Sequence, residues 1–249
     1  MAMKDTTSAA MQLRLVCGLL ASAARFVPVP FLDDLLREKA LQLMVSRTLR
    51  ERGRTYGSKA VAPLYADEAG CLSGCLMFFV MLPVKLILFP IRTILAIGMS
   101  VKNLARDLSE AVLLGRVLDH VLAADRLPMG AAPEALHADA ARIRLAFANA
   151  SAGTDLTLLR GTLTTALRSV SGLPRAALRA LRGLRGRPEE ADPTEGLSSE
   201  DKAKVEKGAD RILSALETPE MQAFLERFDR TFDENLRLLD ERGAGAPSA

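Results

Sequence analysis

The 249-residue chain has few aromatic side chains: two Tyr, nine Phe and no Trp. Sheet proteins are rich in aromatic and β-branched residues, so this scarcity argues against an all-β fold. Leu and Ala, both strong helix formers, occupy 80 of the 249 positions. We therefore expect an all-α fold, built as a multi-helix bundle.

Histidine and cysteine are also scarce, with two His and three Cys. The low, odd number of cysteines predicts no disulfide framework and favours a reducing compartment. Cys71 and Cys75 have the spacing of a helical metal-ligand pair, and Glu134 with His137 has that of a di-iron ligand pair. Neither pair has the further ligands that such sites need. The sequence therefore predicts no metal and no cofactor.

The usual signatures of catalysis are missing as well. The chain contains no phosphate-binding loop, no glycine-rich dinucleotide motif and no zinc-protease motif. We therefore expect a protein that is not an enzyme. The alternative is an unrecognised catalytic site, which would use the carboxylates of Glu110, Asp119 and Glu134.

Acidic side chains are concentrated near the C-terminus. Residues 1–187 carry 25 basic and 14 acidic side chains, whereas residues 188–249 carry 8 and 16. Such a division predicts an anionic partner for the basic part, or contact between the two parts. The 25 arginines against 8 lysines, with abundant alanine, indicate a G+C-rich bacterial genome.

One stretch of the chain almost lacks charge. Residues 70–84 have none, and residues 70–101 contain only Lys85 and Arg92. A helix needs about 20 apolar residues to cross a bilayer, and residues 76–84 are apolar on every side. We therefore predict that residues 70–101 associate with a membrane. The residues expected to contact lipid are Leu76, Phe78, Phe79, Leu82, Lys85, Leu88, Phe89 and Arg92.

The mode of this membrane contact stays open. Basic residues flank the segment on both sides, so the positive-inside rule gives no orientation. Pro83 and Pro90 are compatible with a helical hairpin, a kinked single span or a helix in the membrane plane. The alternative is a buried helix in a soluble bundle that binds a lipid or another hydrophobic ligand. We expect the protein at the cytoplasmic face of the bacterial inner membrane.

Turn signals divide the chain into segments. Helices are predicted at residues 13–24, 31–52, 94–124, 134–149, 155–171 and 174–185, whereas residues 1–10 are expected to lack regular structure. The expected divisions are N-terminal helices (1–57), the membrane-associating segment with a long helix (58–130), a basic helical region (131–187), a linker (188–199), an acidic C-terminal helical hairpin (200–242) and a flexible tail (243–249).

Three helix starts carry capping signals. Thr154 is the expected N-cap of the helix at 155–171. Ser198 and Asp201 have the spacing of a capping box, and Thr218 stands directly before Pro219, which suits the first helical position.

A short basic helix follows residue 173 and has no acidic side chain. A basic amphipathic helix of this kind is typical of a surface that contacts anionic lipid or an acidic partner. The alternative is a solvated face balanced by the acidic C-terminal region. Nucleic acid is not favoured, because no recognition motif accompanies the arginines. The arginines concerned are Arg175, Arg179, Arg182, Arg185 and Arg187.

The last helix carries Phe224, Phe228 and Phe232 at spacings of four, which places them on one face. We expect this face to bind a protein partner; the alternative is that it packs within the chain. Taken with the apolar segment, these features predict a non-enzymatic, membrane-associated adaptor or scaffold that binds anionic lipid, protein partners or both.

Overall fold

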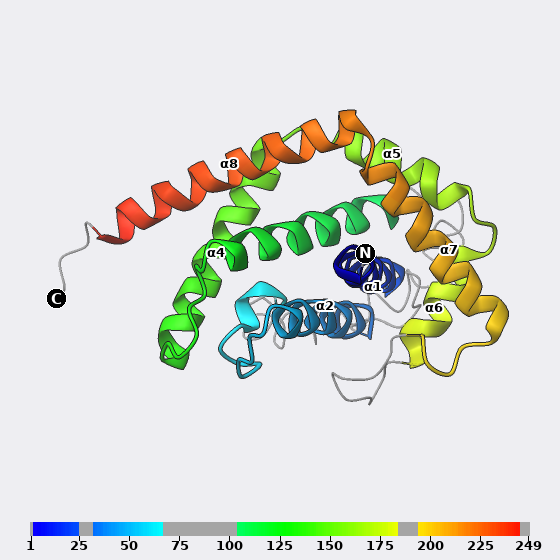
Figure 1. Ribbon diagram of the computed structural model, residues 1–249, viewed down its shortest axis with the longest axis horizontal. Helices are drawn as coiled ribbons and strands as arrows, with labels where there is room; N and C mark the ends of the chain where they lie inside the picture. The colour runs from blue at the N-terminus through cyan, green and yellow to red at the C-terminus, as the bar shows by residue number, and fades with distance from the viewer. Residues whose placement is uncertain (1, 25–31, 67–103, 184–193, 245–249) are drawn as a thin grey trace, which may run out of the picture.

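The computed structural model describes residues 2–24, 32–66, 104–183 and 194–244. This part of the chain is helical and contains no strand, which confirms the all-α prediction (Figure 1). A helix over residues 104–123 is called the central helix below. The other elements are α1 (Ala2–Ala23), α2 (Leu32–Glu51), the 3₁₀ turn η2 (Ala62–Leu64), α4 (Pro133–Gly153), α5 (Thr157–Arg168), α6 (Leu173–Gly183), α7 (Ser199–Leu216) and α8 (Pro219–Ala244).

α1 packs closely against the central helix. A Cβ atom placed on Gly18 would lie 3.1 Å from the Cβ of Ala111, so the helices approach at a position where α1 has no side chain. Nearer the start of α1, Arg14 forms an ion pair with Asp119 of the central helix. From Arg14 to Gly18 the residue numbers of α1 rise, whereas those of their partners in the central helix fall from Asp119 to Ala111. The two helices are therefore antiparallel.

α2 completes this layer and runs parallel to the central helix. Arg37 near the start of α2 lies 2.9 Å from Glu110, and Arg52 just after its end lies 3.0 Å from Asp119. The C-terminal end of α1, the N-terminal end of α2 and the start of the central helix at residue 104 therefore lie together. We call this region the 104 end of the body.

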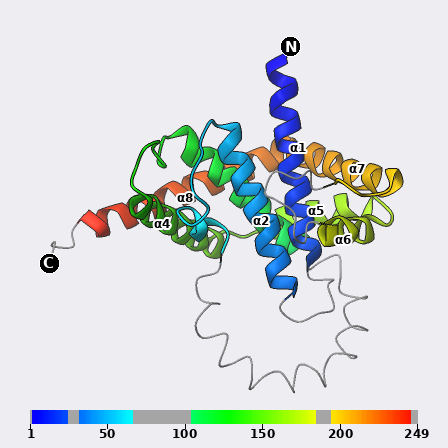
Figure 2. The ribbon, with the colours of Figure 1, turned by 90° about the horizontal axis from the view of Figure 1, so that it is seen from below.

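The remaining helices surround this layer. α8 runs beside the central helix and packs on α4, and its last turns project beyond α4 (Figure 1). α7 packs on α1, α5 and α6, and α6 packs on α1 and α7. Figure 2 shows α6 beside the C-terminal part of α1, with the N-terminus of α1 at the far side of the body. Buried side chains from all of these helices form one hydrophobic cluster.

Two of the three capping signals have the expected effect. The Ser198 hydroxyl accepts a hydrogen bond of 3.2 Å from the backbone N–H of Asp201, and Pro219 is the first residue of α8. Thr154 is not the N-cap of α5, since its hydroxyl instead donates to a carbonyl of α4. The N-cap is Leu156, and Asp155 before it accepts a hydrogen bond from the backbone N–H of Thr157 at 2.9 Å.

Two expectations about the chain ends are wrong. Residues 2–10 were expected to lack regular structure, but they form the first turns of α1. α7 and α8 were expected to form a hairpin, but they meet near their junction and diverge, each packing mainly on other helices (Figure 1). The physical reason is that the apolar face of each helix finds a larger partner surface on the body than on its neighbour.

Candidate functional site

The clearest cluster of charged side chains joins the central helix to α8. Arg116 donates three hydrogen bonds to the carboxylate of Asp229, at 2.9, 3.0 and 2.7 Å. One helical turn further along, Nε2 of His120 lies 2.8 Å from Asp233. Beyond the end of the central helix, Arg126 donates to Asp240 at 3.0 Å. We call these three contacts the charge ladder.

The charge ladder fixes the direction and register of α8. The partners in its three contacts are separated by 113, 113 and 114 residues, so the two helices advance together and are parallel. A shift of α8 by one turn would leave only one of Arg116 and His120 opposite an aspartate, because Asp229 and Asp233 are themselves one turn apart, and would separate Arg126 from Asp240. The basic body and the acidic C-terminal region are thus in direct contact in the described structure.

The aromatic face of α8 lies beneath these contacts. Phe224, Phe228 and Phe232 are 4, 0 and 0% exposed. The ring of Phe228 meets Phe147 of α4 edge to face at 6.2 Å, and the ring of Phe232 meets His120 in the same way at 6.3 Å. The expectation that these three side chains are available to a protein partner is therefore wrong, because the body covers them.

A second charged cluster is centred on Arg14 of α1. Its guanidinium group pairs with Asp119 and, at 2.8 Å, with Glu51 at the end of α2. Arg52 pairs with Asp119 as well, at 3.0 Å. The Arg14 side chain is only 11% exposed, and its Nε atom is buried without a hydrogen-bond partner. This cluster ties α1, α2 and the central helix together at one place.

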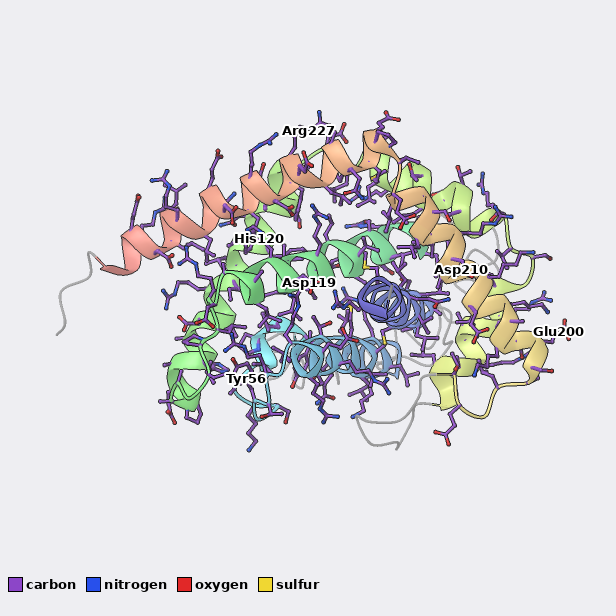
Figure 3. All side chains as sticks on the ribbon, in the orientation of Figure 1. Tyr56, Asp119, His120, Glu200, Asp210 and Arg227 are labelled. Atoms are coloured by element: carbon purple, nitrogen blue, oxygen red, sulfur yellow. The ribbon has the colours of Figure 1, made fainter. Side chains whose placement is uncertain are left out.

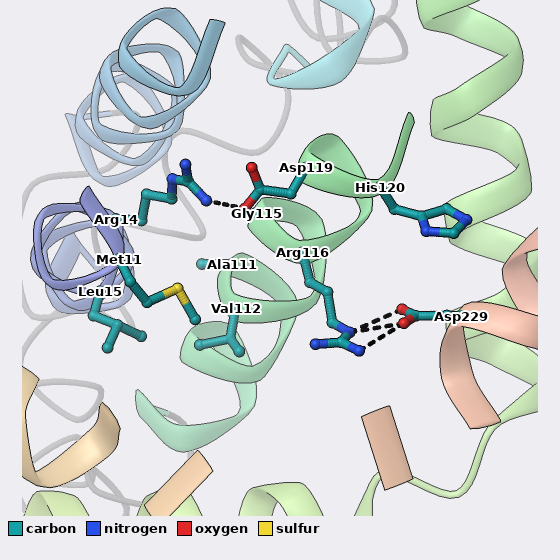
Figure 4. A pocket seen from close by; sticks show the side chains of 10 residues that line it. All are labelled: Met11, Arg14, Leu15, Ala111, Val112, Gly115, Arg116, Asp119, His120 and Asp229. Atoms are coloured by element: carbon teal, nitrogen blue, oxygen red, sulfur yellow. Dashed lines mark hydrogen bonds and ion pairs between the residues drawn. The ribbon is translucent and has the colours of Figure 1, made fainter. Parts of the chain in front are cut away.

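A cavity of about 260 Å³ lies between α1, the central helix and α8, with the two charged clusters at its sides (Figure 4). Its apolar wall consists of Met11, Leu15, Ala111 and Val112. Asp119 and His120, adjacent in sequence, project to opposite sides of the central helix (Figure 3). The arginines and carboxylates that line the cavity already pair with one another, so they offer a ligand no uncommitted charge.

The carboxylates considered for catalysis do not gather in this cavity. Asp119 lines it, whereas Glu110 and Glu134 do not. Glu110 is held between Arg37 at 2.9 Å and Arg144 at 3.1 Å. Among the described residues, no group of three or more potential ligands is placed to hold a metal ion.

Part of the basic helix predicted after residue 173 is visible as α6. Arg175 is exposed, and Arg179 is 62% exposed while it pairs with Asp201 of α7 at 2.5 Å. The Asp201 side chain is only 7% exposed, and its hydrogen bond from Arg179 lowers the pKa of its carboxyl below the usual value. The side chain of Arg182, and all of Arg185 and Arg187, lie outside the described residues.

The predicted membrane-associating segment also lies outside the described residues, which resume at residue 104. Within the helices that the structure describes, none combines the length and the hydropathy needed to cross a membrane. The residues concerned are Leu76, Phe78, Phe79, Leu82, Lys85, Leu88, Phe89 and Arg92.

Sequence reasoning did not find the charge ladder or the role of Arg14. A signal for the ladder is present in α8, where Asp229, Asp233 and Asp240 follow the spacing i, i+4, i+11 beside the apolar stripe. This spacing indicates an acidic stripe at the edge of a buried face. It does not indicate which basic helix lies opposite, because that depends on how the helices pack.

No protein-family model, curated protein or solved structure matches the chain, so the comparisons assign it no family.

Proposed function

We propose that the protein is a non-enzymatic, membrane-associated adaptor whose helical body is held at a bilayer by residues 70–101. The main observation in support of this proposal is that the segment has almost no charge: Lys85 and Arg92 are the only charged residues among its 32. Fifteen uncharged residues come first, and a hydrocarbon phase accommodates such a run without the cost of burying charge.

The described body is suited to present surfaces to a partner. One hydrophobic cluster spans its helices, and the charge ladder fixes α8 in register on the central helix. The outer side of α8 carries exposed charges, among them Glu226, Arg227 and Arg230. A rigid body with charged, exposed helix faces supports binding to proteins or lipid headgroups at the cytoplasmic face of a bacterial membrane.

The rival proposal, a soluble bundle that binds a hydrophobic ligand, has one observation in its favour. The cavity beside Met11 and Leu15 has an apolar wall. Its volume of about 260 Å³ is below the range of about 300–1,000 Å³ usual for small-molecule sites. A long-chain lipid would not fit there without movement of the helices, so we favour the membrane proposal.

The test is extraction of membranes that contain the full-length protein, first with high salt and then with alkaline carbonate. We expect the wild type to stay in the pellet through both washes. The variant Phe79→Asp/Leu82→Asp should move to the supernatant, since each aspartate in a bilayer core costs about 3 kcal/mol.

The matched control is Leu145→Asp/Leu238→Asp. These leucines are 49 and 43% exposed on the body, so the same chemical change should leave extraction unchanged. Retention of the Phe79/Leu82 variant at the wild-type level would refute the proposal. Release of the wild type by salt alone would show that charge, and not the apolar segment, holds the protein at the membrane.

A further inference from the structure

The 104 end of the body is where the apolar segment rejoins the described chain. Only Lys102 and Asn103 separate the segment 70–101 from residue 104, where the described chain resumes in the central helix. If residues 70–101 are in the bilayer, the start of the central helix is close to the lipid headgroups. The ends of α1 and α2 that lie beside it share that position.

α6 lies at the same end of the molecule. It contacts both α1 and α2, and Figure 2 shows it beside the C-terminal part of α1. Its buried side is formed by Leu173, Ala176, Ala177, Ala180 and Leu181. Its exposed side carries Arg175 and Arg179.

The two ends of the body differ in whether their arginines form ion pairs with carboxylates. At the end opposite residue 104, Arg52, Arg54 and Arg126 each pair with an aspartate, at 3.0, 2.5 and 3.0 Å. At the 104 end, Arg37 pairs with Glu110, whereas Arg106 and Arg175 are exposed and form no ion pair among the described side chains. The guanidinium groups of Arg106 and Arg175 are therefore available to an external anion.

The neighbouring charges are of both signs. On α2, Asp33 and Asp34 lie in the first turn, and exposed Glu38 stands next to Lys39. Asp107 of the central helix is buried at 5% exposure. On α6, Arg179 already forms an ion pair with Asp201. Of the two arginines on the exposed side of α6, Arg175 is therefore the one available to an external partner.

We propose that the 104 end of the body faces the membrane and that Arg106 and Arg175 contact the phosphates of anionic lipids there. This inference rests on the proposed membrane association and adds the orientation of the body and the lipid class. Guanidinium groups suit this role because they donate paired hydrogen bonds to phosphate oxygens and are weakly hydrated.

The test measures partition of the full-length protein into vesicles of phosphatidylcholine, with and without about 30% phosphatidylglycerol, at low salt. The quantity of interest is the ratio of the two partition coefficients, because it isolates the contribution of anionic headgroups. Each basic side chain at such a surface contributes about a factor of five, so Arg106→Gln/Arg175→Gln should lower the ratio about 30-fold.

The matched control is Arg227→Gln/Arg230→Gln, two exposed arginines of α8, a different helix (Figure 3). Both variants change the net charge from +3 to +1, so a general effect of charge would lower both ratios equally. We expect the control ratio to stay within about twofold of the wild type. Arg106→Lys/Arg175→Lys should keep most of the preference, since the charge is retained.

The outcomes separate the two proposals. Wild type that binds neither kind of vesicle overturns the membrane association itself. Wild type that binds both vesicles equally, or equal losses in the 104-end and α8 variants, overturns the orientation while leaving insertion intact. A selective loss in Arg106→Gln/Arg175→Gln supports the orientation, and an unchanged thermal unfolding curve shows that the variant is folded.

Discussion

The contact between Arg116 and Asp229 should make a measurable contribution to the stability of the body. The pair has three hydrogen bonds between charged groups, and its side chains are 30 and 18% exposed. Hydrogen bonds to charged groups contribute about 1.5–3 kcal/mol when buried. Because solvent screens this pair in part, we expect Asp229→Asn to lower the free energy of unfolding by about 1–2 kcal/mol.

The effect should be visible in thermal unfolding. For a chain of this length, 1 kcal/mol corresponds to about 2–4 °C in Tm, so Asp229→Asn should lower Tm by about 2–8 °C. Glu226→Gln is the control, because Glu226 is exposed on the same helix and its substitution removes the same charge as Asp229→Asn. We expect its Tm to stay within about 2 °C of the wild type.

A double-mutant cycle with Arg116→Gln separates the pair from general effects of charge. If the two side chains stabilise the protein together, the double variant should be more stable than the sum of the single effects predicts, by about 1 kcal/mol. A coupling energy near zero would refute the reasoning, as would equal losses in Asp229→Asn and Glu226→Gln.

Three further predictions concern packing and pH. A Cβ on Gly208 would lie 2.7 Å from both Cδ atoms of Leu173, so Gly208→Ala should lower the free energy of unfolding in urea by about 1–2 kcal/mol. Gly161 has open space around it, so Gly161→Ala should raise the free energy of unfolding by about 0.5–1 kcal/mol. Stabilisation of the protein by both substitutions would contradict the packing of Gly208 against Leu173. Phe228→Ala should cost about 3–5 kcal/mol, because the ring is fully buried, and a loss below about 1 kcal/mol would show that α8 is not packed as described. The lowered pKa of Asp201 means that its contribution is complete above about pH 5 and is lost as the pH falls below about 4. Wild type should therefore unfold at a higher temperature than Asp201→Asn at pH 7, and the difference should shrink as the pH falls through the lowered pKa of Asp201; a constant difference in Tm would be evidence against the ion pair.

Local signals in the sequence identified most of the described helices. The pattern at 31–52 gave α2 within a residue at each end, and Ser198 with Asp201 located the start of α7. Such features depend on neighbours a few residues apart, which the sequence displays directly. The same reasoning missed the first turns of α1 and the start of α5, where Leu156 is the N-cap and Asp155 accepts a hydrogen bond from Thr157.

The sequence patterns did not predict which residues the charged and aromatic side chains contact. Phe228 and Phe232 lie on one apolar face whether the face is covered by the same chain or by another protein. Only the packing of α8 on the central helix and α4 shows that the chain itself covers them. Likewise, Arg14 and Asp119 are separated by 105 residues, a distance over which sequence spacing carries no information about contact.

The sequence by itself determined that the protein is all-α, that its charge is divided between a basic body and an acidic C-terminal region, and that residues 70–101 are almost uncharged. Composition and periodicity suffice for these properties because they belong to single helices or to the chain as a whole. The tertiary structure decided that α8 lies parallel to the central helix, with Asp229 on Arg116 and Asp233 on His120. It also decided that Arg106 and Arg175 have no ion-pair partner among the described side chains, because the partner of a charge depends on which helices the hydrophobic core brings side by side.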